Sequence, residues 1–218
     1  MSAVINRAAS PGRRERRRMD TEQRIMNAAL QLFSEQGYAN TTIDAIANAA
    51  DIGKGTFFNY FASKEHLIMV FGERLVGELV AAAASMKPDT PVRELVRGAV
   101  HKVVAEWHAN QRLLRSILGA ALSNDTMAER FQTLLAKARA NVALLMAEGQ
   151  RRGELRNDIS AADLARLLQQ TMMGAQILWS LRPASDLVAT ADQALDVFWC
   201  GIEAPPARLA RSSKRSRR

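Results

Sequence analysis

Apolar residues recur at helical spacing along almost the whole chain, and this periodicity is the feature that most restricts the fold. In the segment that follows Pro91, for example, Val92, Leu95, Val96 and Ala99 fall on one helical face. No segment alternates polar and apolar residues with the period of two that marks a half-buried strand. The spacing therefore predicts an all-α protein of about nine helices.

The predicted helices begin after cap residues or prolines and end at glycines or polar clusters. The first is expected to open at Asp20 or Thr21, with Gln23 completing a capping box, and to stop at Gly37. The others are expected at about 41–50, 54–60, 63–87, 91–107, 111–122, 127–148, 160–181 and 186–202.

The net charge of +8 comes from the two ends of the chain. Residues 1–18 carry six arginines and one acid, and residues 208–218 carry six lysines or arginines and no acid. The remaining 189 residues hold 18 basic and 21 acidic side chains, a net charge of −3. We expect residues 1–18 to be a disordered basic arm and residues 204–218 a disordered basic tail. Both are commonly solvated ends, and the N-terminal arm, which leads directly into a folded element, also suits attraction to nucleic-acid phosphates.

Several protein classes are excluded by what the sequence lacks. No apolar run reaches the roughly 18 residues of a membrane span, and the arginine-rich N-terminal segment is unlike a secretory signal. Cys200 is the single cysteine, which excludes an internal disulfide and fits a reducing compartment. The three histidines, His66, His101 and His108, do not cluster as metal ligands do. We expect a cytoplasmic protein without enzyme chemistry, bound metal, cofactor or membrane contact.

Residues 20–66 contain three short predicted helices, of which the second and third are joined by a tight turn. This is the helix-turn-helix arrangement, in which the last helix enters the DNA major groove. A small structural bundle is the alternative. Two details favour DNA binding. The third helix is too short to be stable alone and is rich in aromatic residues. Lys54, Gly55 and Thr56 at its start allow close approach to phosphates and base edges.

These residues resemble the DNA-binding signature of the tetracycline-repressor (TetR) family of bacterial regulators. The two stretches that carry the resemblance are Thr41-Thr42-Ile43-Asp44-Ala45-Ile46-Ala47 and Ala50-Asp51-Ile52-Gly53-Lys54-Gly55-Thr56-Phe57-Phe58-Asn59-Tyr60-Phe61-Ala62-Ser63-Lys64-Glu65. Residues 153–158 resemble a connection in the C-terminal body of that family, more weakly. The resemblance implies a homodimer with a DNA-binding domain, here residues 19–66. It also implies a helical domain for ligand binding and dimerisation, here residues 67–203.

The chain departs from the family pattern at three places. Asp51-Ile52-Gly53 stands where Gly-Val-Ser is common, Phe58 replaces a frequent phosphate-contacting tyrosine, and Ala62 replaces a frequent proline. Aspartate tolerates the left-handed conformation and glycine serves as an N-cap, so we expect the turn to be kept. One hydroxyl contact to phosphate is expected to be missing at Phe58.

The resemblance also implies a role for individual residues at the DNA. Thr42 would bind a phosphate, and Lys54, Gly55, Thr56 and Asn59 would face bases or adjacent phosphates. Tyr60 and Lys64 would grip the DNA backbone. The structural alternatives are that Thr42 only caps its helix, Tyr60 only packs and Lys64 is a solvated lysine. Phe57 and Phe61 are assigned to the core.

The resemblance implies a ligand cavity in the body, and large apolar side chains and adaptable methionines there suit an apolar effector. The candidate lining residues are Trp107, His108, Phe131, Met172, Met173, Gln176 and Trp179. For any one of them taken singly, ordinary core is the better-supported explanation, since methionines and aromatic residues at helical spacing more often belong to the core. The effector itself is not identified by the sequence.

The last two predicted helices, 160–181 and 186–202, carry apolar residues on more than one side, which predicts a homodimer through a four-helix interface. The favoured function is a transcriptional regulator, a repressor that an apolar or amphipathic effector releases from a palindromic operator. The effector would act by tilting the helix that starts at Ser63, which touches both domains. The alternative is an architectural or interaction protein that binds DNA without a ligand.

Overall fold

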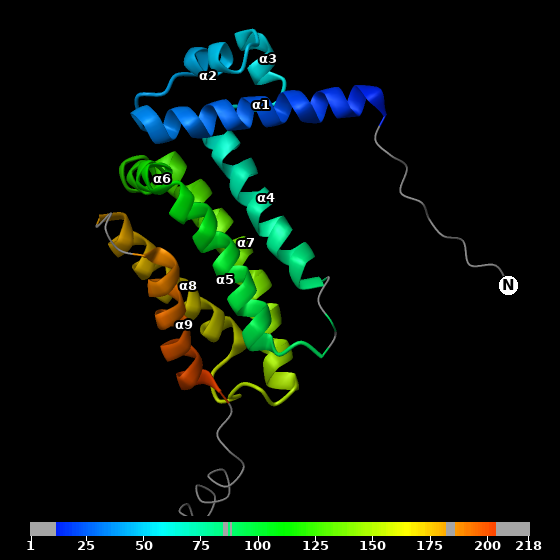
Figure 1. Ribbon diagram of the computed structural model, residues 1–218, viewed down its shortest axis with the longest axis vertical. Coiled ribbons are helices and arrows are strands. Elements are labelled where there is room, and N and C mark those ends of the chain that lie inside the picture. Colours follow the sequence, from blue (N-terminus) through cyan, green and yellow to red (C-terminus); the bar gives the residue numbers. More distant parts are fainter. Residues whose placement is uncertain (1–11, 85–86, 88, 182–185, 204–218) are drawn as a thin grey trace, which may run out of the picture.

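A computed structural model gives the fold (Figure 1) and describes residues 12–84, 87, 89–181 and 186–203. Within these ranges the chain forms nine α-helices and no strand, apart from an isolated bridge between Leu155 and Glu203. The helices are α1 (Arg13–Gln36), α2 (Ile43–Ala49), α3 (Lys54–Phe58), α4 (Lys64–Ala84), α5 (Val92–Ala109), α6 (Gln111–Ser123), α7 (Asp125–Arg151), α8 (Ala161–Leu181) and α9 (Leu187–Ile202). The all-α prediction is confirmed.

Helix α1 begins at Arg13 rather than at Asp20, so the expected disordered arm is wrong for residues 13–18. Arginine is a good helix former, and residues 13–36 contain no proline or glycine. The helix therefore extends toward the N-terminus as far as Arg13, directly after Gly12. The expected capping box at Asp20 therefore lies inside the helix. Residues 1–11 of the arm and the tail 204–218 lie outside the described residues.

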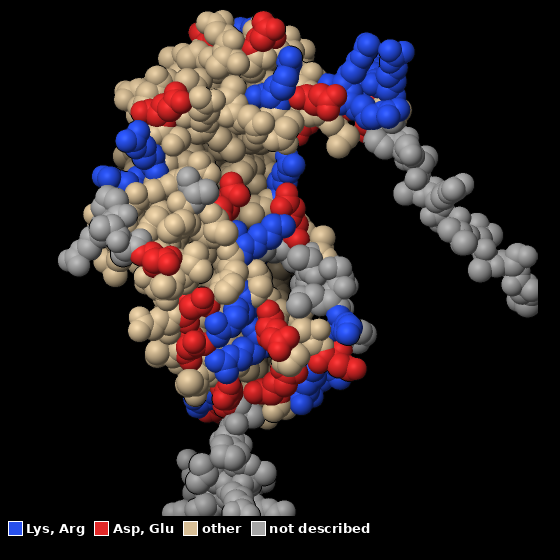
Figure 2. Space-filling model, viewed as in Figure 1, with Lys and Arg blue, Asp and Glu red and all other residues tan. Residues whose placement is uncertain are grey.

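The first turns of α1 project beyond the rest of the molecule (Figure 1). Residues 12–20 are all exposed, and Figure 2 shows lysine and arginine side chains gathered at this projecting end. The lower part of the face in Figure 2 mixes both signs of charge. The strongest concentration of positive charge in this view therefore lies beside the helix-turn-helix and not on the body.

Helix ends in the N-terminal domain use the residues that the sequence marks for them. Gly37 ends α1 with a φ of 86°. The hydroxyl of Thr42 accepts a hydrogen bond from the Ala45 backbone N–H, 3.1 Å away, and so caps α2. Ser63 caps α4 by accepting from the His66 N–H at 3.1 Å. These contacts fix where α1 ends and where α2 and α4 start, and so determine the position of α3, which lies between α2 and α4 in the chain.

The core is divided into two clusters that meet along α6. The N-terminal cluster includes Phe33, Ile46, Phe57 and Phe61, each at most 1% exposed. Phe57 and Phe61 thus occupy the core, as predicted. Leu113 and Ile117 of α6 and Met127 of α7 belong to the same cluster. The body has its own cluster, built from α5 to α9.

Helix α6 is a second connection between the two domains. It packs directly on α1, and the backbone N–H of Tyr38, after α1, donates to the Ser116 hydroxyl of α6 at 2.5 Å. The sequence pointed only to the helix that starts at Ser63 as a link. The fold therefore joins the two domains through α6 as well as through α4.

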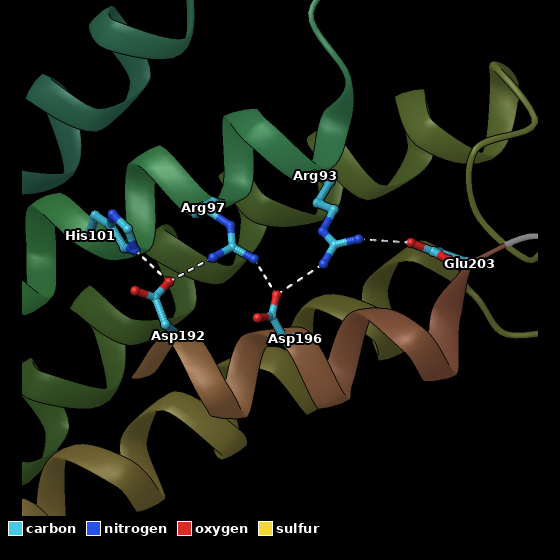
Figure 3. Close-up of polar contacts among 6 residues, drawn as sticks. All are labelled: Arg93, Arg97, His101, Asp192, Asp196 and Glu203. Atoms are coloured by element: carbon cyan, nitrogen blue, oxygen red, sulfur yellow. Dashed lines mark hydrogen bonds and ion pairs between the residues drawn. The ribbon is translucent and has the colours of Figure 1, made fainter. Parts of the chain in front are cut away.

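A row of charged side chains holds α9 against α5 (Figure 3). Arg93 Nη2 lies 2.9 Å from Asp196, Arg97 Nη1 lies 2.8 Å from Asp192, and Arg97 also contacts Asp196. His101 Nε2 lies 2.6 Å from the same Asp192 carboxylate, and Arg93 also reaches Glu203 at 3.2 Å. Each pair is partly exposed and contributes at most about 1 kcal/mol, but the shared carboxylates fix the position of α9 along α5.

Candidate functional site

The turn between α2 and α3 has the geometry of a helix-turn-helix. Asp51 adopts a left-handed conformation with a φ of 52°, as expected for a residue that tolerates it. The Ile52 N–H donates to the Ala47 carbonyl at 3.0 Å, and the Thr56 N–H donates to the Gly53 carbonyl at 2.9 Å. Ile46 and Phe57 join α2 and α3 through the core. The short third helix is therefore held by packing and by the turn.

The predicted DNA-facing residues occupy the open side of this unit. Lys54, Gly55 and Asn59 are exposed, and Thr56 and Tyr60 are half-buried. These residues lie on α3 or directly after it, and the buried side chain of this segment is that of Phe57. Phe58 is 49% exposed on the same segment, where the resemblance leads one to expect a tyrosine. The structure thus brings five of the seven predicted residues together on one surface.

Thr42 and Lys54 also make contacts within the protein. Thr42 is exposed and acts as the α2 cap described above, but its hydroxyl hydrogen stays available because the cap uses only a lone pair. Lys54 Nζ lies 2.8 Å from Asp44, and both side chains are more than half exposed. A solvated pair of this kind is weak and can exchange partners.

Lys64, predicted to grip the DNA backbone, makes contacts within the protein. Its ammonium donates to the carbonyls of Tyr38 at 3.0 Å and Thr41 at 2.6 Å. It also lies 4.4 Å from the centroid of the Tyr38 ring. Burial lowers the pKa of the Lys64 ammonium from its ordinary value. The side chain thus ties the start of α4 to the connection between α1 and α2.

Tyr38 is a residue of this region that sequence reasoning missed. Its hydroxyl donates to Glu65, and burial together with that bond raises the pKa of the hydroxyl well above its ordinary value. Burial alone would raise the pKa of the Glu65 carboxyl, but hydrogen bonds from Ser63 and Tyr38 outweigh it and lower that pKa. No local pattern signals a contact between residues 27 positions apart.

The body contains a cavity of about 350 Å³ between α4, α5, α6, α7 and α8. This volume lies at the lower end of the range for small-molecule sites. Trp107, Phe131, Met172, Met173 and Gln176 line it, as predicted. The rest of the lining is mainly aliphatic, with Arg139, Asn141 and Gln169 as further polar members. Leu114, Ile117 and Leu118 of α6 also contribute.

Two predicted cavity residues, His108 and Trp179, lie outside this lining. Their rings stack on each other with centroids 5.7 Å apart, His108 exposed and Trp179 buried. One residue along a helix is a rotation of about 100°, so His108 points away when Trp107 faces the cavity. Arg139 and Gln169 are the polar members that sequence reasoning missed, because an arginine and a glutamine on amphipathic helices are most simply assigned to the surface.

Two further expectations concern membranes and metals. No helix among the described residues is both long and apolar enough to cross a membrane. In the same part of the chain, no three histidine, cysteine or acidic side chains are grouped as a metal site would need.

Two family profiles match the sequence. The profile "Bacterial regulatory proteins, tetR family" matches residues 25–69, and the profile "Tetracyclin repressor-like, C-terminal domain" matches residues 88–197. The second match alone covers half of the chain. Among curated proteins, the HTH-type transcriptional regulator UidR of Escherichia coli (strain K12) is 28% identical over 157 residues, covering 71% of this chain and 79% of UidR.

Solved structures show the same fold. Thermus thermophilus FadR, described as a repressor in complex with lauroyl-CoA, superposes with a TM-score of 0.64 at 25% identity, over 81% of this chain and 92% of that one. Salmonella enterica GusR gives a TM-score of 0.67 at 23% identity, over 89% of this chain and 96% of that one. The second comparison shows the fold alone.

Proposed function

The chain belongs to the TetR family of bacterial regulatory proteins, and from this premise we propose how it binds DNA and how it is released. It is a DNA-binding transcriptional regulator. The observation that carries the proposal is the combination of an open α3 surface with a separate apolar cavity, whose helices α4 and α6 also pack in the N-terminal core behind α3. An architectural protein would need the first feature but not the second.

At the DNA, α3 lies in the major groove. Thr56 and Asn59 face base edges, while Lys54 and the Gly55 backbone approach phosphates at the start of α3. Thr42 and Tyr60 contact the backbone on either side. Lys64 acts as a positioning residue, because its ammonium is already bound to two carbonyls. This assignment is supported by the exposure of the α3 residues and the burial of Phe57 behind them.

A second protomer binds the outer face of α8 and α9. Leu167, Ile177, Leu178 and Leu181 of α8 are 39–68% exposed, and Val197 of α9 is 72% exposed. Such a run of large apolar side chains suits a four-helix interface across a two-fold axis. The two α3 helices of the dimer would read half-sites roughly 34 Å apart, which requires a palindromic operator. The protein would act in the cytoplasm, where that DNA is found.

The effector is an apolar or amphipathic small molecule, and its binding weakens DNA binding. The related FadR of Thermus thermophilus, a repressor described in complex with lauroyl-CoA, supports this class of ligand. In this chain, Ile117 both lines the cavity and packs in the N-terminal core. A ligand that displaces α6 or α4 therefore shifts α3. A coupling of about 1–3 kcal/mol would reduce operator affinity on the order of 5–150-fold.

The proposal is tested by footprinting followed by titration. The expected footprint is a short palindrome near a promoter, and uniform coverage would instead favour an architectural protein. The effector that releases the operator should change the tryptophan fluorescence of the protein over the same concentration range, since Trp107 lines the cavity. By reciprocity, saturating operator must weaken effector binding by the same factor. Equal effector affinity with and without operator would refute the switch.

A further inference from the structure

The cavity holds a buried amide that the protein does not satisfy. Gln176 on α8 is 9% exposed and lines the cavity. Its side chain forms no hydrogen bond with any described residue, and neither of its amide atoms is sealed from the cavity. Water that enters the cavity can therefore reach the amide. A ligand that fills the cavity and excludes this water must hydrogen-bond the amide itself, because leaving it buried without a partner would cost about 1–3 kcal/mol.

A second polar group lies where the cavity opens to the surface. Arg139, Gln169 and Leu135 line both the apolar cavity and a shallow outer groove between α7 and α8. The Arg139 guanidinium donates to Gln169 Oε1 at 3.0 Å, and Gln169 Nε2 donates to the Leu135 carbonyl at 2.8 Å. Both ends of the Gln169 amide are therefore used, which holds the guanidinium at the mouth.

Arg139 has no carboxylate partner among the described residues. Arg93, Arg97, Arg151 and Arg166 pair with acids, whereas Arg112, Arg115 and Arg130 form no ion pair with a described residue either but do not line the cavity. Glu129 lines the outer groove as well, but it is ten residues away along α7, or about 15 Å. The guanidinium is half-buried and keeps most of its five N–H donors available. Such a group suits bidentate binding of a carboxylate or a phosphate.

Gln169 and Gln176 are seven residues apart on α8, which places them on one face with an axial rise of about 10 Å between them. Because the Arg139 guanidinium is bonded to Gln169, this rise approximates the spacing between the guanidinium and the Gln176 amide. Met172 and Met173 lie between them and line the same wall. The polar groups are thus arranged as an anion site at the mouth and an amide inside, with an apolar wall between.

We propose that the effector is an amphipathic anion whose aliphatic chain carries a hydrogen-bonding group, such as a hydroxyl or a carbonyl, about 10 Å from its anionic end. Arg139 receives the anionic group at the mouth, and Gln176 receives the inner polar group. The proposal rests on the proposed function and specifies the ligand of that same cavity. A ligand with a plain saturated chain would fit this cavity less well, because it would cover the Gln176 amide without offering it a hydrogen bond.

The test uses the full-length protein and three probes: decanoate, ω-hydroxydecanoate and decanol. Binding is followed by tryptophan fluorescence, to which Trp107 in the cavity lining contributes, and by calorimetry. Arg139→Leu should weaken both carboxylates by roughly 10–100-fold, the effect of removing a charged hydrogen bond, and change decanol binding little. Arg151→Leu is the matched control, since it removes an exposed arginine of α7 outside the cavity, and it should change no affinity.

Gln176→Leu should weaken ω-hydroxydecanoate by roughly tenfold or more, because the buried hydroxyl loses its partner. It should leave decanoate equal or tighter, a sign reversal that general damage to the fold would not produce. If Gln176→Leu weakens the binding of decanoate and ω-hydroxydecanoate equally, or weakens neither, the proposed role of Gln176 is wrong. Undiminished binding of decanoate to Arg139→Leu would overturn the anion site. If decanol alone binds and releases DNA, the proposed function stands and this inference fails. If no probe binds the wild-type protein, the proposed ligand class is wrong.

Discussion

Replacing Lys64 by methionine tests whether this lysine braces the fold or grips DNA. Methionine keeps the aliphatic stem over the Tyr38 ring but removes the ammonium that donates to the Tyr38 and Thr41 carbonyls. Thr41 is 1% exposed, so its carbonyl has little access to water as a substitute partner. Lys54→Met is the matched control, because Lys54 is exposed and pairs only with the exposed Asp44.

The magnitude follows from the two hydrogen bonds. A bond to a charged donor contributes about 1.5–3 kcal/mol, and these two share one partly buried ammonium, so we expect a loss of about 2–3 kcal/mol. In a chain of this size that loss corresponds to a Tm decrease of about 4–12 °C. Lys54→Met should change stability by less than about 1 kcal/mol, as for other exposed ion pairs.

The assay combines thermal unfolding at fixed protomer concentration with the salt dependence of binding to a duplex selected from random sequence. Lys54→Met should reduce the slope of log K against log salt by about 0.9 for each phosphate that the lysine neutralises. Lys64→Met should leave the slope unchanged at a temperature where the variant is folded. Unchanged stability combined with a reduced slope for Lys64→Met would refute the bracing role.

Three further results are expected. Thr56→Ala should change which duplexes are selected, by about 1–3 kcal/mol at one base pair of each half-site, and an unchanged selected sequence would contradict the base contact. Leu178→Lys, at a position that is 68% exposed on α8, should convert the dimer to a monomer in sedimentation at micromolar concentration; a variant that remains dimeric would place the interface elsewhere. Hydrogen bonds from Arg151 and Arg152 lower the pKa of Glu148 to about 2, so their stabilising effect is fully present above about pH 4.5 and is lost as the pH falls toward 2. Glu148→Gln should flatten the dependence of Tm on pH in this window, and an identical dependence in both proteins would show that the pair contributes nothing.

The sequence alone determined the helices and the position of the DNA-facing segment, because both depend on local patterns. Apolar spacing located the long helices, and Gly37, Thr42, Asp51 and Ser63 act at the helix ends where they were expected. The exception is the start of α1 at Arg13. There the arginines were interpreted by their charge, although their helix propensity and the absence of a breaker after Gly12 decide the conformation.

The tertiary structure decided which side chains meet across helices. The cavity was predicted as a group of large apolar residues, yet which of them line it depends on how each helix is rotated, so that Trp107 faces the cavity and His108 does not. Arg139 and Gln169 form the mouth because α7 and α8 pack against each other. Lys64 is bound internally because the chain before α2 folds back over the start of α4. Contacts of this kind join residues 23 to 30 positions apart. Helical periodicity fixes only which residues share a face, whereas the partner of that face is set by the packing of the whole core.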